Sequence, residues 1–149
     1  MFGKVNWQRS GFALALGLGS AVALSGGGFW ISLNNPAASS DPQAKGSLVM
    51  VRSEGCADPG KSVITGTAEG LVNGRRQSVP LKLVPLSQPG VYVVKREWPE
   101  EGAWVLTLVG TYMGHNRTAL VRIGPDGFER KSIKMFPRLL TKEELESYF

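Results

Sequence analysis

The pattern of hydrophobic and polar positions divides the chain into three parts. Residues 11–33 are mainly apolar and contain no charged side chain. Residues 34–46 are rich in Pro, Ser, Ala and Asn and show no apolar periodicity, which is typical of a flexible linker. From residue 47 onward, short β-prone runs alternate with Gly/Pro turns. We therefore expect a signal peptide or signal-anchor helix over residues 1–33, a linker over 34–46, a β domain over 47–136 and a tail over 137–149.

Seven short runs in the third part predict strands, because each is rich in β-branched or aromatic residues and is bounded by turn residues. The run at 103–109 is apolar on both faces, which indicates a central strand, and Pro80 places the run that contains it at a sheet edge or beside a bulge. Asn73-Gly74 predicts a hairpin turn. No helical period separates the runs, so the pattern favours an all-β, seven-stranded antiparallel sandwich over a parallel α/β sheet. The runs are 48–51, 63–67, 78–84, 91–98, 103–109, 118–123 and 128–135.

The last nine residues have a helical pattern. Thr141 and Glu144 have the spacing of a capping box, and Leu145, Tyr148 and Phe149 form an apolar edge. We therefore expect a short C-terminal helix, which either packs against the sandwich or docks onto a partner.

The N-terminal apolar segment predicts export. Lys4 and Arg9 precede it, and residues 12–24 have the length of a signal-peptide h-region, followed by the small residues of a cleavage site ending at Ser25. Apolar residues resume at Phe29, and the 23 residues from 11 to 33 are long enough to span a bilayer. This length, with Trp30 at the far interface, favours a retained anchor over a cleaved signal. Both readings place the rest of the chain outside the cytoplasm, in the periplasm or at the cell surface.

Charge and cysteine content narrow the function further. The net charge is +5, and no Lys/Arg run with interleaved aromatic residues is present, so a nucleic-acid partner is not expected. Cys56 is the chain's one cysteine, which excludes an intramolecular disulfide. A buried thiol, a reactive thiol and pairing with another chain all remain open for Cys56.

The chemistry-bearing residues do not indicate an enzyme. The chain has one histidine, His115, and lacks the motifs of hydrolases, zinc proteases and nucleotide-binding enzymes, so we expect no catalytic residue and no small-molecule substrate. Met113 and His115 form a soft thioether–imidazole pair that suits copper, which Met50, Met135 or Cys56 could complete. The alternative is that Met113 and His115 belong to an ordinary turn between two strands, and no cofactor is bound.

The segment from Pro89-Gly-Val-Tyr92 to Trp98-Pro-Glu-Glu-Gly-Ala-Trp104-Val-Leu-Thr-Leu108 resembles a P-G-x-Y … G-x-W-x-L-x-L pattern. This pattern occurs in small extracytoplasmic immunoglobulin-like domains of the FixH-like, YtkA-like and CopC-like families. The resemblance covers roughly residues 48–135 and implies core roles for Tyr92 and Trp104. Copper-binding relatives also use an early histidine that this chain lacks, so only Met113 and His115 could stand for such ligands.

These patterns together predict a non-enzymatic, extracytoplasmic β-sandwich that binds or assists a protein or cell-envelope partner, tethered through residues 11–33 or secreted. A copper-binding or copper-delivery domain that uses Met113 and His115 is the alternative.

Overall fold

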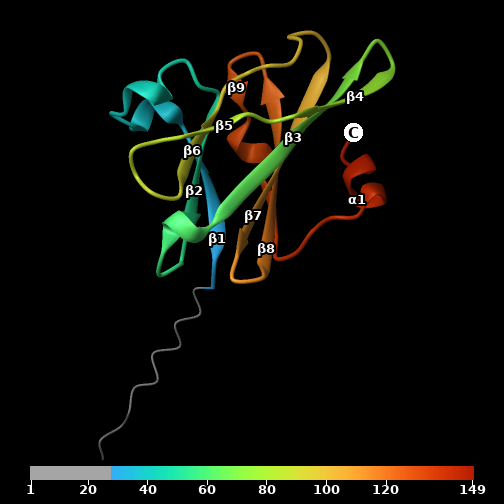
Figure 1. Ribbon diagram of the computed structural model, residues 1–149. Coiled ribbons are helices and arrows are strands. Elements are labelled where there is room, and N and C mark those ends of the chain that lie inside the picture. Colours follow the sequence, from blue (N-terminus) through green and yellow to red (C-terminus); the bar gives the residue numbers. More distant parts are fainter. Residues whose placement is uncertain (1–27) are drawn as a thin grey trace, which may run out of the picture.

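The computed structural model describes residues 28–149, whose strands form two antiparallel sheets that enclose a common core (Figure 1). Every strand pair is antiparallel, as the sequence predicts, but the described residues contain ten strands rather than seven. Sheet A has the order β1 (Trp30–Asn34), β2 (Val49–Glu54), β6 (Val91–Val94) and β5 (Leu83–Pro85). Sheet B has the order β10 (Lys134–Phe136), β8 (His115–Gly124), β7 (Ala103–Tyr112), β3 (Val63–Val72) and β4 (Arg75–Pro80), and β9 (Gly127–Phe128) pairs with β8.

The core lies between the sheets and follows the two-residue period of the strands. On β7, Trp104, Leu106 and Leu108 point inward and are almost fully buried, against Val49 and Val51 of β2. Burying an aliphatic side chain of this size stabilises the fold by about 1.5–3 kcal/mol. The prediction that 103–109 forms a central strand is therefore confirmed, since β7 lies between β8 and β3.

Two of the predicted strands are divided in the structure. The run at 78–84 crosses from one sheet to the other: β4 ends at Pro80 on the edge of sheet B, and β5 begins at Leu83 on the edge of sheet A. Pro80 has no N–H to donate to a further strand, so an edge position suits it. The run at 128–135 is likewise divided by the 3₁₀ turn η4 (Arg130–Ser132).

The domain begins earlier than residue 47. Strand β1 pairs with β2 along its whole length, and Phe29, Ile31 and Leu33 are buried in the core. A Cβ at Gly110 of β7 would lie 2.5 Å from Ile31 Cγ2, which shows how closely β1 packs onto the opposite sheet. The apolar residues after Gly28 are therefore part of the sandwich rather than the end of a membrane helix, and Trp30 is a strand residue. Residues 1–27, with the rest of the predicted segment, lie outside the described residues, and within 28–149 no helix has the length and apolarity to cross a bilayer.

The predicted linker is folded. Residues 35–46 form two 3₁₀ turns, η1 (Pro36–Ala38) and η2 (Pro42–Ala44), which are capped by the side chains of Asn35 and Asp41. Ala44 is buried against Met50, Val91 and Val93 in a second, smaller cluster on the outer face of sheet A. Residues 34–46 are thus a wall of the domain and not a spacer.

The C-terminal helix is confirmed. Helix α1 (Lys142–Glu146) begins with a complete capping box, in which Thr141 and Glu144 exchange side-chain and backbone hydrogen bonds. The tail returns to sheet B: Arg76 of β4 pairs with Glu146 and stacks on the ring of Phe149, and Arg122 of β8 donates to the backbone oxygen of Tyr148. It therefore packs against the sandwich.

Candidate functional site

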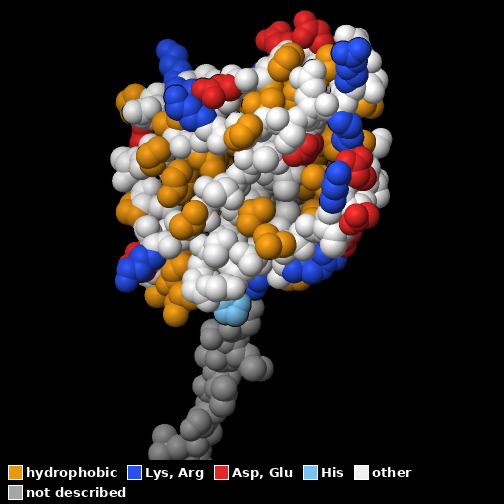
Figure 2. All heavy atoms as spheres, turned by 45° about the vertical axis from the view of Figure 1, so that its right-hand side comes forward, with side chains coloured by type: hydrophobic (Ala, Val, Ile, Leu, Met, Phe, Trp, Pro, Cys, Tyr) orange, Lys and Arg blue, Asp and Glu red, His pale blue; other side chains and the backbone are white. Residues whose placement is uncertain are grey.

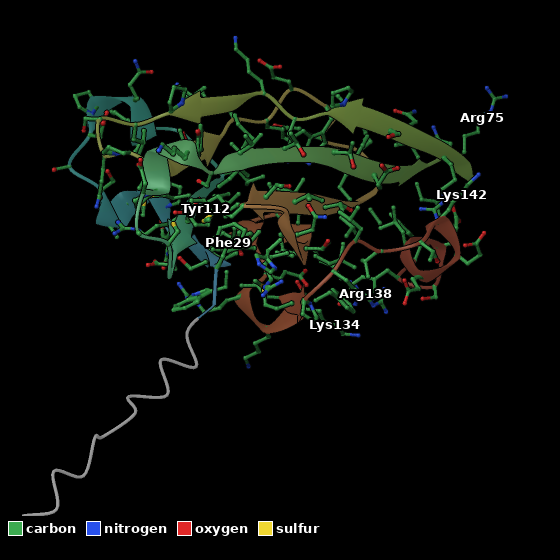
Figure 3. The ribbon with its side chains drawn as sticks, turned by 60° about the horizontal axis from the view of Figure 1, so that its bottom comes forward. Phe29, Arg75, Tyr112, Lys134, Arg138 and Lys142 are labelled. Carbon is green, nitrogen blue, oxygen red and sulfur yellow. The ribbon has the colours of Figure 1, made fainter. Side chains whose placement is uncertain are left out.

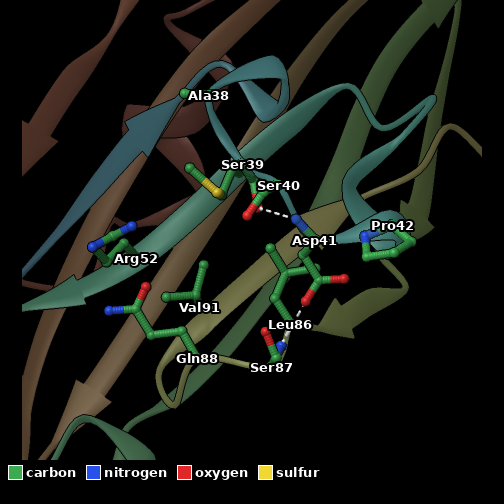
Figure 4. Close-up of a pocket in the computed structure, with 11 residues that line it drawn as sticks. Ala38, Ser39, Ser40, Asp41, Pro42, Arg52, Leu86, Ser87, Gln88 and Val91 are labelled. Atoms are coloured by element: carbon green, nitrogen blue, oxygen red, sulfur yellow. Dashed lines mark hydrogen bonds between the residues drawn. The ribbon is translucent and has the colours of Figure 1, made fainter.

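A groove of about 540 Å³ on the outer face of sheet A is the candidate site (Figure 4). Its floor is apolar and comes from Met50 of β2, Val91 of β6 and Leu86 in the loop before β6. Its rim is polar and combines Arg52 with side chains of the 39–41 and 87–88 loops. The lining residues are Ala38, Ser39, Ser40, Asp41, Pro42, Met50, Arg52, Leu86, Ser87, Gln88 and Val91.

Asp41 holds the two walls of the groove together. One carboxylate oxygen accepts from the backbone N–H of Ser87 at 2.8 Å (Figure 4). The other accepts from the N–H of Gln43 at 2.9 Å. These hydrogen bonds, the one from Ser87 first, lower the pKa of Asp41 below its usual value. A hydrogen bond from the N–H of Asp41 to Ser39 Oγ shapes the same wall. The groove is therefore built by specific contacts between segments 46 residues apart.

A row of polar side chains continues from the groove across the outer face of sheet A. Arg52 Nε lies 3.9 Å from Glu54 Oε1, Ser32 Oγ donates to the same oxygen at 3.1 Å, and Asn34 donates to Ser32. Trp30, paired with Glu54 in the register, is 44% exposed, and its ring lies against Gly55. The surface thus offers an aromatic ring, a guanidinium and hydroxyl groups side by side, which suits recognition of a partner that carries both polar and apolar groups.

Met113 and His115, the predicted copper ligands, lie at the hairpin that joins β7 to β8. Tyr112 pairs with His115, and Met113 and Gly114 form a two-residue turn in which both have positive φ, +48° and +77°. This is the geometry of a type I′ turn, in which Asn or Gly is preferred at the position that Met113 occupies. Met113 is 81% exposed, so it lies outside the core.

The residues considered as further copper ligands lie on three other segments, of which the Cys56 loop contacts the hairpin through a hydrogen bond from the Asp58 N–H to the Tyr112 hydroxyl at 3.3 Å. Met50 is buried in the cluster beneath residues 35–46, and Met135 lies on β10. Cys56 is a free thiol in the loop after β2. Within residues 28–149, no group of three or more His, Cys, Asp and Glu side chains could hold a metal ion.

The environment of Cys56 disfavours a reactive thiolate. The side chain is half-buried and packs against the main core. Burial raises the pKa of the Cys56 thiol, and the carboxylates of Glu54 and Asp58 raise it further.

The sequence pattern does not predict the groove, because residues 34–46 have the composition of a linker. A local signal was present: Asn35-Pro36 and Asp41-Pro42 are dipeptides that favour turns, with a capping side chain directly before a proline. The contact between Asp41 and Ser87 had no such signal.

Compared with models of protein families, with curated proteins and with solved structures, the chain matches none of them. The resemblance of the segment around Tyr92 and Trp104 to extracytoplasmic sandwiches stays a prediction.

Proposed function

We propose that this protein is a non-enzymatic, extracytoplasmic β-sandwich domain that binds a protein or other cell-envelope partner through the outer face of sheet A. The groove is the observation that supports this proposal. Its apolar floor can bury part of a partner, and its polar rim can satisfy the partner's hydrogen-bonding groups.

The start of the fold at Phe29 supports a cleaved signal over a retained anchor. With Phe29, Ile31 and Leu33 buried in the sandwich, 17 uncharged residues remain from 11 to 27, the lower limit for a membrane span. The most apolar stretch, residues 12–24, has the length of an h-region. Cleavage after Ser25 leaves three glycines before the first buried residue, so the mature chain begins where the fold begins. The intact mass of the protein isolated from cells tests this: loss of the first 25 residues supports cleavage, and the full mass supports the anchor.

The strand order supports an immunoglobulin-like topology. The order β1-β2-β6-β5 corresponds to A-B-E-D of an immunoglobulin sandwich, and β8-β7-β3-β4 corresponds to G-F-C-C′. We infer that β10 and the C-terminal tail are additions to the G edge. Such sandwiches serve many functions, so the topology supports a binding role only together with the groove.

A position-specific cross-linking experiment in living cells tests the groove. A photo-reactive amino acid at Gln88, on the groove rim, is compared with one at Gln77, an exposed residue of β4 in the other sheet. We expect a discrete cross-linked product from position 88 that is absent from position 77 and is weakened by Arg52→Ala. Identical products from both positions, or none from position 88, would contradict a partner in the groove.

Copper binding remains a second candidate, favoured by the geometry of the β7–β8 hairpin. Met113 has a positive φ that usually belongs to Asn or Gly, and its thioether is exposed two residues from His115. Copper(I) titration of the protein, with His115→Ala and Met113→Asn as variants, tests this candidate. We expect a site that both substitutions weaken. Binding weaker than about 10 μM, or unchanged in both variants, would remove it.

A further inference from the structure

The C-terminal tail and sheet B enclose a small basic concavity. It has a volume of about 240 Å³ and lies where Ser147 and Tyr148 cross β8 and the segment that precedes β10. Three of its six lining residues are cationic and none is acidic. The lining residues are Arg122, Lys131, Ser132, Lys134, Ser147 and Tyr148.

The three cations come from different elements and lack a carboxylate partner. Arg122 lies on β8, Lys131 in η4 and Lys134 on β10, and none of them forms an ion pair within residues 28–149. Ion pairs elsewhere join Lys61 to Asp58 and Lys82 to Glu97. Figure 2 shows basic and acidic side chains next to one another along its right-hand side. Glu129 lines a neighbouring hollow that shares Arg122 and Tyr148, and its carboxylate lies against Gly124.

Tyr148 fixes this arrangement and leaves one donor unused. Arg122 donates to its backbone oxygen at 3.2 Å, and the Lys134 ammonium lies 4.5 Å from the centre of its ring. The Tyr148 hydroxyl is buried and has no hydrogen-bond partner among the described residues. The hydroxyl is thus closed off from solvent, and Tyr148 contributes to the concavity through its ring and backbone oxygen, which contact Lys134 and Arg122.

Ser132 and Ser147 are already engaged. Ser132 Oγ accepts from the N–H of Arg122 and donates to the carbonyl of Glu129, and Ser147 Oγ donates to the carbonyl of Glu144. The groups free to bind a ligand are thus the three cations, all of which attract an anion. Figure 3 shows Lys134 near Arg138 on the side of the molecule that carries the C-terminal helix.

We propose that this concavity is a binding site for a phosphate or sulfate group. A tetrahedral oxyanion presents several strong acceptors, which matches the ammonium and guanidinium donors that line the concavity. The anion relieves the repulsion among the three cations. The group can be free or borne by an anionic lipid headgroup, and this site is independent of the sheet A groove.

The test is a titration of the protein, as processed in cells, with inorganic phosphate at constant ionic strength, followed by backbone amide NMR shifts. We expect saturable shifts at residues 122, 132–134 and 147–149. Lys134→Gln should weaken binding about fivefold, as expected for the loss of one exposed charged contact. Lys82→Gln is the matched control, because Lys82 is exposed and pairs with Glu97 on another part of the surface.

Flotation with vesicles distinguishes the source of the anion. If vesicles that contain an anionic phospholipid retain the protein in a Lys134-dependent way, and neutral vesicles do not, the group is a lipid headgroup. Saturable phosphate binding without vesicle retention indicates a free or polymer-borne group. The proposal is overturned if neither phosphate nor anionic vesicles bind, or if Lys134→Gln and Lys82→Gln bind alike. Neither result bears on the groove, which the cross-linking at position 88 tests separately.

Discussion

Gly70→Ala tests the packing around Trp104, whose ring lies in the core between the two sheets. Gly70 on β3 pairs with Trp104 on β7, and a Cβ at position 70 would lie 2.5–2.6 Å from three atoms of the indole ring. Ordinary contacts are nearer 3.5–4 Å, so the ring would have to withdraw by about 1 Å. Trp104 is only 2% exposed, its Nε1 donates to the carbonyl of Glu101 at 2.8 Å, and its ring packs at 6.1 Å from that of Trp98. The ring therefore has little room to move.

The magnitude follows from these contacts. Overpacking of a full core costs about 1–3 kcal/mol, and a weakened indole hydrogen bond adds about 1 kcal/mol. Replacing glycine by alanine within a strand stabilises the folded state by about 0.5–1 kcal/mol, which offsets part of this cost. We therefore expect Gly70→Ala to lower the free energy of unfolding by about 2 kcal/mol, roughly a 30-fold change in the folding equilibrium.

Urea unfolding followed by tryptophan fluorescence and circular dichroism measures this change. Gly60→Ala is the control, because Gly60 has no positive φ and a Cβ there would meet its neighbours at 3.5–3.6 Å, so its effect should stay within about 0.5 kcal/mol. In a Trp104→Leu background the cost of Gly70→Ala should shrink, because the ring that it strikes is gone. Equal stability of the Gly70 and Gly60 variants would refute the reasoning.

Three further predictions concern titration and loop order. Glu144 has its pKa lowered to about 2 by the bidentate hydrogen bonds from Arg138 and then by the N–H of Thr141. Since this pKa lies below the ordinary value of 4.5, the stabilisation of the tail is complete above pH 4.5 and is lost as the pH falls toward 2. An NMR titration of the Glu144 carboxyl with a midpoint near 4.5 would contradict this prediction. Asp41→Ala should speed amide exchange of Gln43 and Ser87 about tenfold, and an unchanged rate would argue against the clamp. Alkylation of Cys56 should show a midpoint above the ordinary thiol pKa of 9.0, and a midpoint below it would contradict the burial.

Local patterns predict most of sheet B, because its strands alternate and its turns have strong signals. The Asn73-Gly74 turn joins β3 and β4 with positive φ at both residues, and the capping box starts α1 at the expected place. The run that contains Pro80 does lie at a sheet edge. Where two sheets compete for one run, as at 78–84, the sequence holds no signal for the crossing, because only the tertiary pairing decides it.

The start of the domain could not be predicted from the local pattern. Trp30 points outward from β1, yet it is apolar, so Phe29-Trp30-Ile31 reads as a continuous hydrophobic run rather than as an alternating strand. Its ring finds its place against Gly55, a contact that sequence alone does not reveal. The groove could not be predicted from the sequence for the same reason: Asp41 and Ser87 meet only once β2 and β6 have paired.

The central claim is that the sandwich works as a binding domain outside the cytoplasm. Gln77→Cys, combined with Cys56→Ser, places a single exposed thiol on β4. A membrane-impermeant maleimide is added to cells whose outer layers are permeabilised and whose cytoplasmic membrane is intact. We predict labelling at position 77 without lysis, at the level seen after lysis. Labelling that appears only after the cytoplasmic membrane is broken would contradict the account.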